Sequence, residues 1–305
     1  MKERVMEQVL AAKRAEKARA AQEAESRKDA AFAVPEISAA QQAYVEAYYS
    51  DMFRHGKPSE RTRALHEEYL AALAAHGFSE SDFQPAAVCP VCNDTGTVNG
   101  QPCECVRAEF VKQLGIACDI APEGFCFDDF SDAVIADGAQ AENLNKIYSK
   151  MRAYTEKYPA VNRRIIVMSG KTGTGKTVLA TAMARNMIRR GYSALILSAM
   201  NFNSLMVKCH TSPYSERDGI LRDVMDADML VIDDLGTEPR YRNVTCEYLL
   251  LVLEERSSRK LSTVITTNLS PDDIMRQYNE RIYSRMCDKR GSLFLPFTGD
   301  DLRLK

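Results

Sequence analysis

The sequence has little net charge and no long apolar run. Its 305 residues carry 40 Lys and Arg against 42 Asp and Glu. No overall field therefore draws the chain to nucleic acid or to a membrane, and any such contact must come from a local patch. No apolar run reaches the length of a membrane-spanning helix, and the N-terminus lacks the apolar core of a secretory signal. Nine cysteines, an odd number, suit reduced thiols and metal ligands. We expect a cytoplasmic protein without membrane contact.

Three helices are predicted near the N-terminus. Residues 1–31 are rich in Ala, Glu, Lys, Arg and Gln, which favours a solvated helix, with a partner-binding arm as the alternative interpretation. Residues 38–53 and 59–76 also have helical patterns. The expected division of the chain is an N-terminal region at 1–115, a linker at 116–137 and an α/β domain at 138–305.

Two cysteine pairs in the N-terminal region have the spacing of a small zinc knuckle. A C-x-x-C pair and a C-x-C pair are separated by ten residues that include Asn, Asp and Gly. Four thiolates in tetrahedral reach bind Zn²⁺, and the metal would fold a stretch too small to form its own core. Free thiols or a disulfide are the alternatives, with a redox role as the main competing interpretation. Cys118 or Cys126 could replace a proposed ligand. The proposed ligands are Cys89, Cys92, Cys103 and Cys105.

Strand and helix patterns alternate from about residue 138 onward. Nearly continuous apolar runs such as Met229–Ile232 predict a parallel sheet that helices cover on both faces. The expected strands are 164–168, 193–198, 228–233, 262–267 and 292–297. The expected helices are 139–157, 176–190 and 243–258, followed by a pair between 271 and 288.

A glycine-rich stretch, GKTGTGKT, lies between the first of these strands and the helix after it. Backbone N–H groups of such a loop and the positive end of the following helix bind phosphate. The Lys176 ammonium is expected to reach the β- and γ-phosphates, and the Thr177 hydroxyl to ligate Mg²⁺. The residues expected to bind a nucleoside triphosphate are Gly170, Thr172, Gly173, Thr174, Gly175, Lys176 and Thr177.

Polar residues follow two later strands and complete the predicted site. Asp233 and Asp234 end an apolar strand; the first is expected to hold Mg²⁺, and the second to orient the attacking water or accept its proton. Because Asp is one methylene shorter than the Glu common at that place, we expect slow hydrolysis. Asn268 ends the following strand, where its amide can bond both the γ-phosphate and the water.

Two arginines lie four residues apart in the stretch NERIYSRM, near the end of the chain. On a helix Arg281 and Arg285 would share one face. Such a face could present a guanidinium to the γ-phosphate of a neighbouring subunit, where it would stabilise the charge that develops during transfer. A surface pair bonded to Asp or Glu is the alternative.

These motifs, in the order GKTGTGKT, VIDDLG, TTN and NERIYSRM, resemble the AAA+ ATPases of the DnaC/DnaI helicase-loader type and the IstB-like transposition ATPases. The resemblance covers about residues 125–305. It implies a AAA+ P-loop domain that binds ATP, in which Arg285 acts on a neighbouring subunit and Arg281 supports it. Twenty residues follow Arg285, so we expect no C-terminal helical lid, a feature that such loaders also lack. Residues 198–206 resemble the extra helix that loaders insert after the second strand.

The resemblance also implies partners. Residues 1–115 would dock a hexameric replicative DNA helicase, while the ATPase domain would self-associate and grip single-stranded DNA, with Lys208 and His210 as candidate contacts. One alternative is an ATPase helper of a transposase, which the zinc knuckle disfavours because such helpers generally lack one. The other is a nucleotide-dependent DNA-binding scaffold without turnover.

Overall fold

The computed structural model describes residues 2–118, 120, 125–127 and 138–304. They form two compact units, one of residues 7–107 and one of residues 108–305 together with the first residues of the chain. The predicted linker at 116–137 therefore lies largely outside the described residues. Among those that are described, no helix is long and apolar enough to cross a membrane.

The unit of residues 7–107 is built on helices. Three helices lead the chain, α1 (Lys2–Phe32), α2 (Pro35–His55) and α3 (Glu60–Ala75), as the sequence predicted. A short 3₁₀ turn η1 (Glu80–Phe83), the hairpin of β1 (Thr97–Val98) and β2 (Gln101–Pro102), and the start of α4 (Glu104–Ala117) follow. Helix α4 was not predicted.

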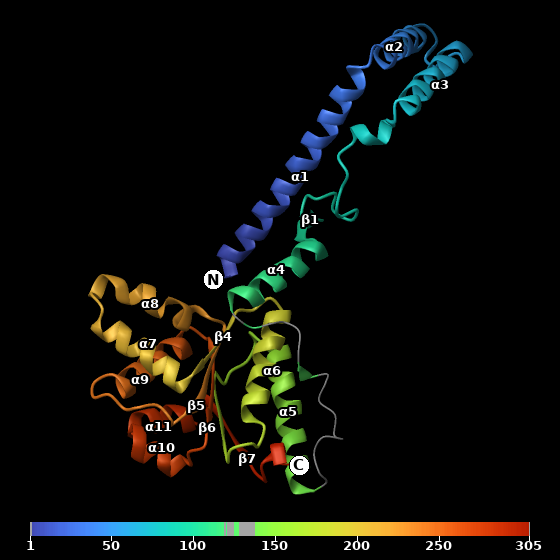
Figure 1. Ribbon diagram of the computed structural model, residues 1–305. Coiled ribbons are helices and arrows are strands. Elements are labelled where there is room, and N and C mark those ends of the chain that lie inside the picture. Colours follow the sequence, from blue (N-terminus) through green and yellow to red (C-terminus); the bar gives the residue numbers. More distant parts are fainter. Residues whose placement is uncertain (1, 119, 121–124, 128–137, 305) are drawn as a thin grey trace. The chain divides into compact units, whose positions relative to one another are not determined.

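Helices α2 and α3 pack as a hairpin around a small apolar core (Figure 1). Ile37 and Leu73 are buried in it, and the rings of Tyr44 and Tyr69 stack with 6.3 Å between their centroids. The Asp51 carboxylate accepts from the Ser59 backbone N–H at 2.8 Å and closes the turn between the helices. This core is small, so the unit depends on local bonds of this kind as well.

The unit of residues 108–305 contains a five-stranded parallel sheet. Its strands are β3 (Ile165–Gly170), β4 (Ala194–Ser198), β5 (Met229–Leu235), β6 (Ser262–Thr267) and β7 (Ser292–Phe297). Their order across the sheet is β4-β5-β6-β3-β7, and every neighbouring pair is parallel. The sheet predicted from the apolar runs is therefore confirmed.

Helices cover both faces of this sheet (Figure 1). On one side lie α5 (Ala139–Lys157) and α6 (Lys176–Arg189). The other side carries α7 (Ala199–Thr211), α8 (Tyr214–Asp226), α9 (Thr245–Ser258), α10 (Pro271–Tyr278) and α11 (Glu280–Cys287). Because successive side chains of a strand point to opposite faces, strands buried on both sides are apolar at nearly every position.

Along the chain, two helices, α7 and α8, connect β4 to β5. The sequence predicted one extra helix in this connection. After β7 the chain forms only a short 3₁₀ turn, η4 (Leu302–Leu304). The predicted AAA+ P-loop architecture, a parallel sheet flanked by helices, is confirmed for the described residues.

Candidate functional site

The glycine-rich loop joins the end of β3 to the start of α6. A Cβ atom at Gly170 would lie 2.3 Å from the Phe297 carbonyl oxygen of the adjacent strand β7, so this position admits only glycine. Gly173 and Gly175 have φ angles of 77° and 93°, a left-handed conformation that costs glycine nothing. Tight packing of the sheet and backbone conformation together account for the three glycines of the motif.

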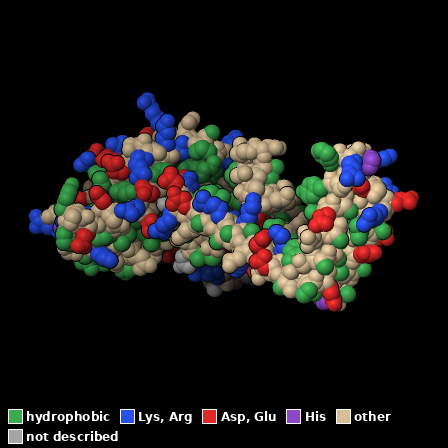
Figure 2. Space-filling view, turned by 90° about the horizontal axis from the view of Figure 1, so that it is seen from above, with side chains coloured by type: hydrophobic (Ala, Val, Ile, Leu, Met, Phe, Trp, Pro, Cys, Tyr) green, Lys and Arg blue, Asp and Glu red, His purple; other side chains and the backbone are tan. Residues whose placement is uncertain are grey.

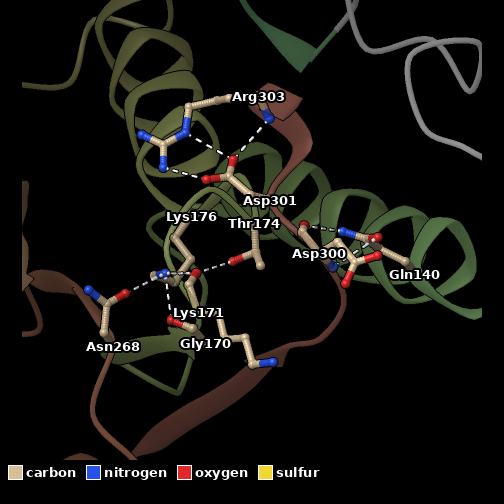
Figure 3. A network of polar contacts seen from close by, with 9 residues as sticks. All are labelled: Gln140, Gly170, Lys171, Thr174, Lys176, Asn268, Asp300, Asp301 and Arg303. Atoms are coloured by element: carbon tan, nitrogen blue, oxygen red, sulfur yellow. Dashed lines mark hydrogen bonds and ion pairs between the residues drawn. The ribbon is translucent and has the colours of Figure 1, made fainter. Parts of the chain in front are cut away.

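The Lys176 side chain is folded back into the loop (Figure 3). Its ammonium donates to the carbonyl oxygens of Gly170 and Lys171, both at 2.7 Å, and to Asn268 Oδ1 at 3.0 Å. Burial lowers the pKa of Lys176, while the nearby Asp234 and Asp233 carboxylates raise it. The loop carbonyls thus hold the ammonium inside the loop, where it also contacts the Asn268 amide that is predicted to bond the γ-phosphate.

A chain of hydroxyl and carboxylate groups connects α6 to β5 and β6. The Thr177 hydroxyl donates to Asp233 Oδ1 at 2.9 Å, and the Thr266 hydroxyl donates to the same oxygen at 2.6 Å. The structure thus brings together the two residues predicted to hold Mg²⁺. Thr266, which the sequence reasoning missed, orients the carboxylate from the neighbouring strand.

Asp234 has an unusual backbone conformation. Its φ angle is 57°, and the pairing of β5 with β6 shifts between Ile232 and Leu235. The Asp234 N–H donates to the Thr266 hydroxyl at 2.8 Å. Such a bulge interrupts the alternation of side chains between the two faces of the sheet. The Asp234 side chain is exposed at the carboxyl edge of the sheet.

The tail after β7 lies against the phosphate loop, and the sequence reasoning missed this contact. The Leu302 N–H donates to the Gly173 carbonyl at 2.9 Å. The Asp301 carboxylate lies so close to Gly173 that a Cβ there would be 1.8 Å from its Oδ1. Arg303 binds this carboxylate at 2.7 Å, and its hydrogen bonds lower the pKa of Asp301 to about 2.

The tail is anchored on the other side by α5. The Gln140 amide donates to the Asp300 carbonyl at 2.9 Å and accepts from the Asp300 N–H at 3.2 Å (Figure 3). These bonds hold a negative charge, that of Asp301, beside a loop whose N–H groups are suited to an anion. The only signal in the sequence was a polar D-D-L-R stretch.

Arg281 and Arg285 both lie on α11, as predicted. The Arg285 guanidinium contacts Glu254 of α9 at 3.0 Å, and its side chain is 56% exposed. Arg281 is exposed as well. The surface ion pair that was the alternative interpretation is thus present within the chain, and exposed pairs of this kind are weak and easily exchanged.

The four predicted thiols meet in one cluster in the unit of residues 7–107. Their Sγ atoms all lie within 4.8 Å of one another; Cys89 and Cys103 are 3.9 Å apart, and Cys92 and Cys105 are 3.7 Å apart. A disulfide would need about 2.05 Å, whereas zinc–thiolate bonds of 2.3 Å in a tetrahedron separate the sulfurs by about 3.8 Å. The cluster therefore fits zinc.

The backbone around the thiols supports metal binding. N–H groups of Cys92 and Val91 lower the pKa of the Cys89 thiol to about 7. The Asp94 carboxylate accepts from the N–H groups of Val88 and Cys89 at 2.7 and 2.9 Å and fixes the first turn. Cys118, a spare candidate, lies instead beside the backbone of Ala194.

A parallel sheet with a glycine loop, a loop lysine and a strand-end acid defines a P-loop domain that binds nucleoside triphosphates. The profile of the family described as IstB-like ATP binding protein matches residues 129–285, just over half of the chain. The chain belongs to this family.

Named relatives agree with the likeness to helicase loaders. The chain is 31% identical to the replicative helicase loader DnaC of Escherichia coli (strain K12) over 166 residues. This matched region covers 54% of this chain and 66% of that protein. It is 26% identical to the replicative helicase loader DnaI of Bacillus subtilis (strain 168) over 161 residues, 52% of this chain and 49% of that protein. The matched region thus spans from about half to about two thirds of the length of these relatives.

A crystal structure of the DnaC helicase loader has 20% sequence identity and a TM-score of 0.46, covering 56% of this chain and 96% of that one.

We expect the substitution Asp301→Asn to tighten ATP binding. It removes a negative charge beside the loop and releases Arg303 toward the incoming phosphates, so affinity should rise about twofold to fivefold, the scale of exposed charge pairs. Titration with a fluorescent ATP analogue in the presence of Mg²⁺ measures this change. Asp300→Asn, one residue earlier, is the charge-matched control. Weaker binding by Asp301→Asn would contradict the interpretation.

Proposed function

We propose that this protein is an ATP-dependent loader of the hexameric replicative DNA helicase onto single-stranded DNA. The observation that carries the proposal is the 31% identity to a replicative helicase loader across the region that holds the phosphate site. The assembled contacts of Lys176, Asn268, Thr177 and Asp233 support it, because a loader of this class needs a working ATP switch.

In this proposal the chain's own groups bind and position ATP. Backbone N–H groups of the loop surround the β-phosphate. The loop residues proposed to bind it are Gly170, Thr172, Gly173, Thr174 and Gly175. Lys176 exchanges its carbonyl partners for the β- and γ-phosphates. Thr177 and Asp233 would hold Mg²⁺, which would neutralise charge on the phosphates when bound.

Hydrolysis in the same proposal uses the carboxyl edge of the sheet. Asp234 orients the attacking water or accepts its proton, and Asn268 holds the water against the γ-phosphate. Because the Asp234 carboxylate reaches one methylene less far than a glutamate, turnover in the isolated chain is slow and rises on assembly or with DNA. A rate in the isolated chain equal to that of the assembled complex would contradict this point.

Arg285 completes the site of an adjacent copy, with Arg281 in support. Arg285 is exposed on α11 and forms only a surface ion pair with Glu254, and both features favour this role. The guanidinium can leave a solvent-exposed carboxylate at little cost in free energy. The ATPase domains would then assemble side by side, and each active site would span two copies.

The Arg285→Ala variant should bind ATP like the parent but lose stimulated hydrolysis. A transition-state arginine contributes roughly 10³-fold or more, so phosphate release in the presence of helicase and single-stranded DNA should fall by about that factor. Arg259→Ala is the matched control, since Arg259 is also an exposed arginine paired with a carboxylate, Asp226 at 2.7 Å. An unchanged stimulated rate would remove Arg285 from the mechanism.

The unit of residues 7–107 is the proposed helicase-docking part, in line with the expected docking region 1–115. On one side of α2, Tyr49 and Phe53 are 69% and 94% exposed, four residues apart, and Met52 between them is 39% exposed. Neighbouring exposed apolar side chains on a folded unit mark a binding surface. A helicase surface that covers these rings would remove them from water.

The double substitution Tyr49→Ser and Phe53→Ser in the full chain should reduce retention of replicative helicase on an affinity column about tenfold or more, since exposed aromatic anchors dominate interfaces. ATP binding should not change. Tyr214→Ser is the control, because Tyr214 is an exposed tyrosine of α8. Full retention by the double variant would exclude this surface. If the parent chain retained a transposase and no helicase, the transposase-helper alternative would replace the loader.

We further propose that the four-cysteine cluster holds a structural Zn²⁺ in the reduced cytoplasm. The spacing of the sulfurs supports this proposal. Cys89, Cys92 and Cys103 are buried, and Cys105 packs against them. Zinc in such a closed site contributes folding energy directly. No step of the ATP chemistry involves it.

Chain purified under reducing conditions should contain about one Zn²⁺ per molecule, and Cys103→Ser should lose it because only three thiolates remain. Elemental analysis measures the content, and melting after chelation measures the loss of stability. Cys246→Ser, which removes a thiol of α9, is the control. Less than half an equivalent in the parent chain would overturn the site.

A further inference from the structure

We propose that Glu238 and Tyr278 are positioning residues that hold helix α11 so that its Arg285 can reach the ATP site of a neighbouring copy. The inference rests on the role proposed above for Arg285 and identifies the contact that supports it. Glu238 lies in the turn after β5, and Tyr278 is the last residue of α10. The sequence analysis singled out neither residue.

The two side chains meet in a buried hydrogen bond. The Tyr278 hydroxyl donates to Glu238 Oε1, and Tyr278 and Glu238 are only 3% and 8% exposed. Burial and the facing carboxylate both raise the pKa of Tyr278, so its hydroxyl keeps the proton and remains the donor. A hydrogen bond to a carboxylate is stronger than a neutral one, and more so where water is excluded. The bond therefore ties the end of α10 firmly to the turn after β5.

The Glu238 carboxylate is itself held by the backbone of that turn. Its Oε2 accepts from the Gly236 N–H at 2.9 Å, and the Thr237 hydroxyl closes the turn by donating to the Asp234 carbonyl at 2.9 Å. A carboxylate with a donor on each oxygen has little freedom to change its rotamer. The anchor for Tyr278 therefore begins beside Asp234, at the carboxyl edge of the sheet.

Close packing against the end of β6 also holds this turn in place. A Cβ atom at Gly236 would lie 2.8 Å from Leu269 Cδ1, and the Thr267 hydroxyl donates to the Leu235 carbonyl at 2.6 Å. Asn268, whose amide is proposed to bond the γ-phosphate, lies between Thr267 and Leu269 in the chain. The anchor is thus built on the same two strand ends as the ATP site.

Tyr278 stands at the junction between α10 and the helix that carries the arginine. The next residue, Asn279, has a φ angle of 127° and caps α11 by accepting from the Ile282 N–H at 3.0 Å. Helix α11 is eight residues long, Glu280–Cys287, which is about two turns. The direction of so short a helix depends on its junction, so fixing Tyr278 also fixes where Arg285 points.

Exposed ion pairs restrain α11 much less than this buried bond does. Figure 2 shows acidic and basic side chains intermixed over the face that it presents, and exposed pairs are weak. The pair of Arg285 with Glu254 is of this exposed kind. When Arg285 leaves Glu254 for a neighbour's phosphate, α11 is still held by its buried residues and by the Glu238–Tyr278 bond.

The bond can therefore affect catalysis without touching the reacting atoms. A guanidinium stabilises the γ-phosphate only within hydrogen-bond distance, and a misplacement of about 1 Å can lower a rate about 100-fold. Loss of the bond should slow hydrolysis in the neighbour that uses this copy's Arg285. It should leave ATP binding at the copy's own loop unchanged.

Tyr278→Phe tests the inference, because it removes only the hydroxyl and keeps the ring. Two full chains are mixed with ATP, Mg²⁺, replicative helicase and single-stranded DNA. The Arg285→Ala chain keeps its ATP site, and the Lys176→Ala chain keeps its arginine, so phosphate release requires one of each. Adding Tyr278→Phe to the Lys176→Ala chain should lower this rate about tenfold or more, with KM for ATP unchanged. Adding it to the Arg285→Ala chain should change the rate by no more than about twofold.

Tyr154→Phe in the Lys176→Ala chain is the matched control, because Tyr154 is also buried and its hydroxyl bonds Ser262 Oγ at 2.6 Å. This control should leave the rate unchanged. Glu238→Gln in the same chain keeps an acceptor oxygen for the tyrosine and should lose less activity than Tyr278→Phe. Unchanged ATP affinity of an otherwise parental Tyr278→Phe chain shows that the ATPase unit is folded.

The possible outcomes separate this inference from the proposals on which it rests. An unchanged rate with Tyr278→Phe in the Lys176→Ala chain would overturn the inference and leave the role of Arg285 intact. Equal losses in both positions would also overturn it, because the bond would then serve the copy's own site. A mixture without phosphate release before Tyr278→Phe is added would contradict the action of Arg285 on a neighbour, and this inference would fail with it.

Discussion

The contact between the Lys176 ammonium and the Asn268 amide depends on one constraint, the order of strands in the parallel sheet. Strand β6 lies between β3, which leads into the phosphate loop, and β5, which carries the acids. The carboxyl ends of parallel strands meet at one edge, so the residue after β6 is placed between the loop and Asp233. Thr266, at the end of the same strand, orients that carboxylate. Interposing β6 therefore supplies both the amide and the hydroxyl.

Strand β7 shapes the loop from the other side. Its close approach at Phe297 makes Gly170 obligatory, and the tail that follows it brings Asp301 against Gly173. A few residues after this strand lie against the loop, where the Leu302 N–H donates to the Gly173 carbonyl. The carboxylate beside the phosphate site is held ionised by Arg303, which gives this chain a local charge that an incoming triphosphate must displace or neutralise.

The two units rely on different physics. The unit of residues 108–305 buries both faces of its sheet and packs its helices around a continuous apolar core. The unit of residues 7–107 has a small core around Ile37, Tyr69 and Leu73 and a separate cluster of four cysteines. A metal can replace core burial in such a stretch.

The sequence by itself determined the local structure. Apolar runs predicted all five strands of the parallel sheet, and the glycine spacing predicted the phosphate loop, because strand burial and φ angles are properties of short stretches. It missed α4 and placed one helix where α7 and α8 stand. Contacts between distant segments were decided only by the tertiary structure: Thr266 with Asp233, Asp301 with Gly173, and Asn203 with the Pro239 carbonyl. Such contacts arise from strand order and close packing, which no local pattern encodes, and each joins residues more than 30 positions apart.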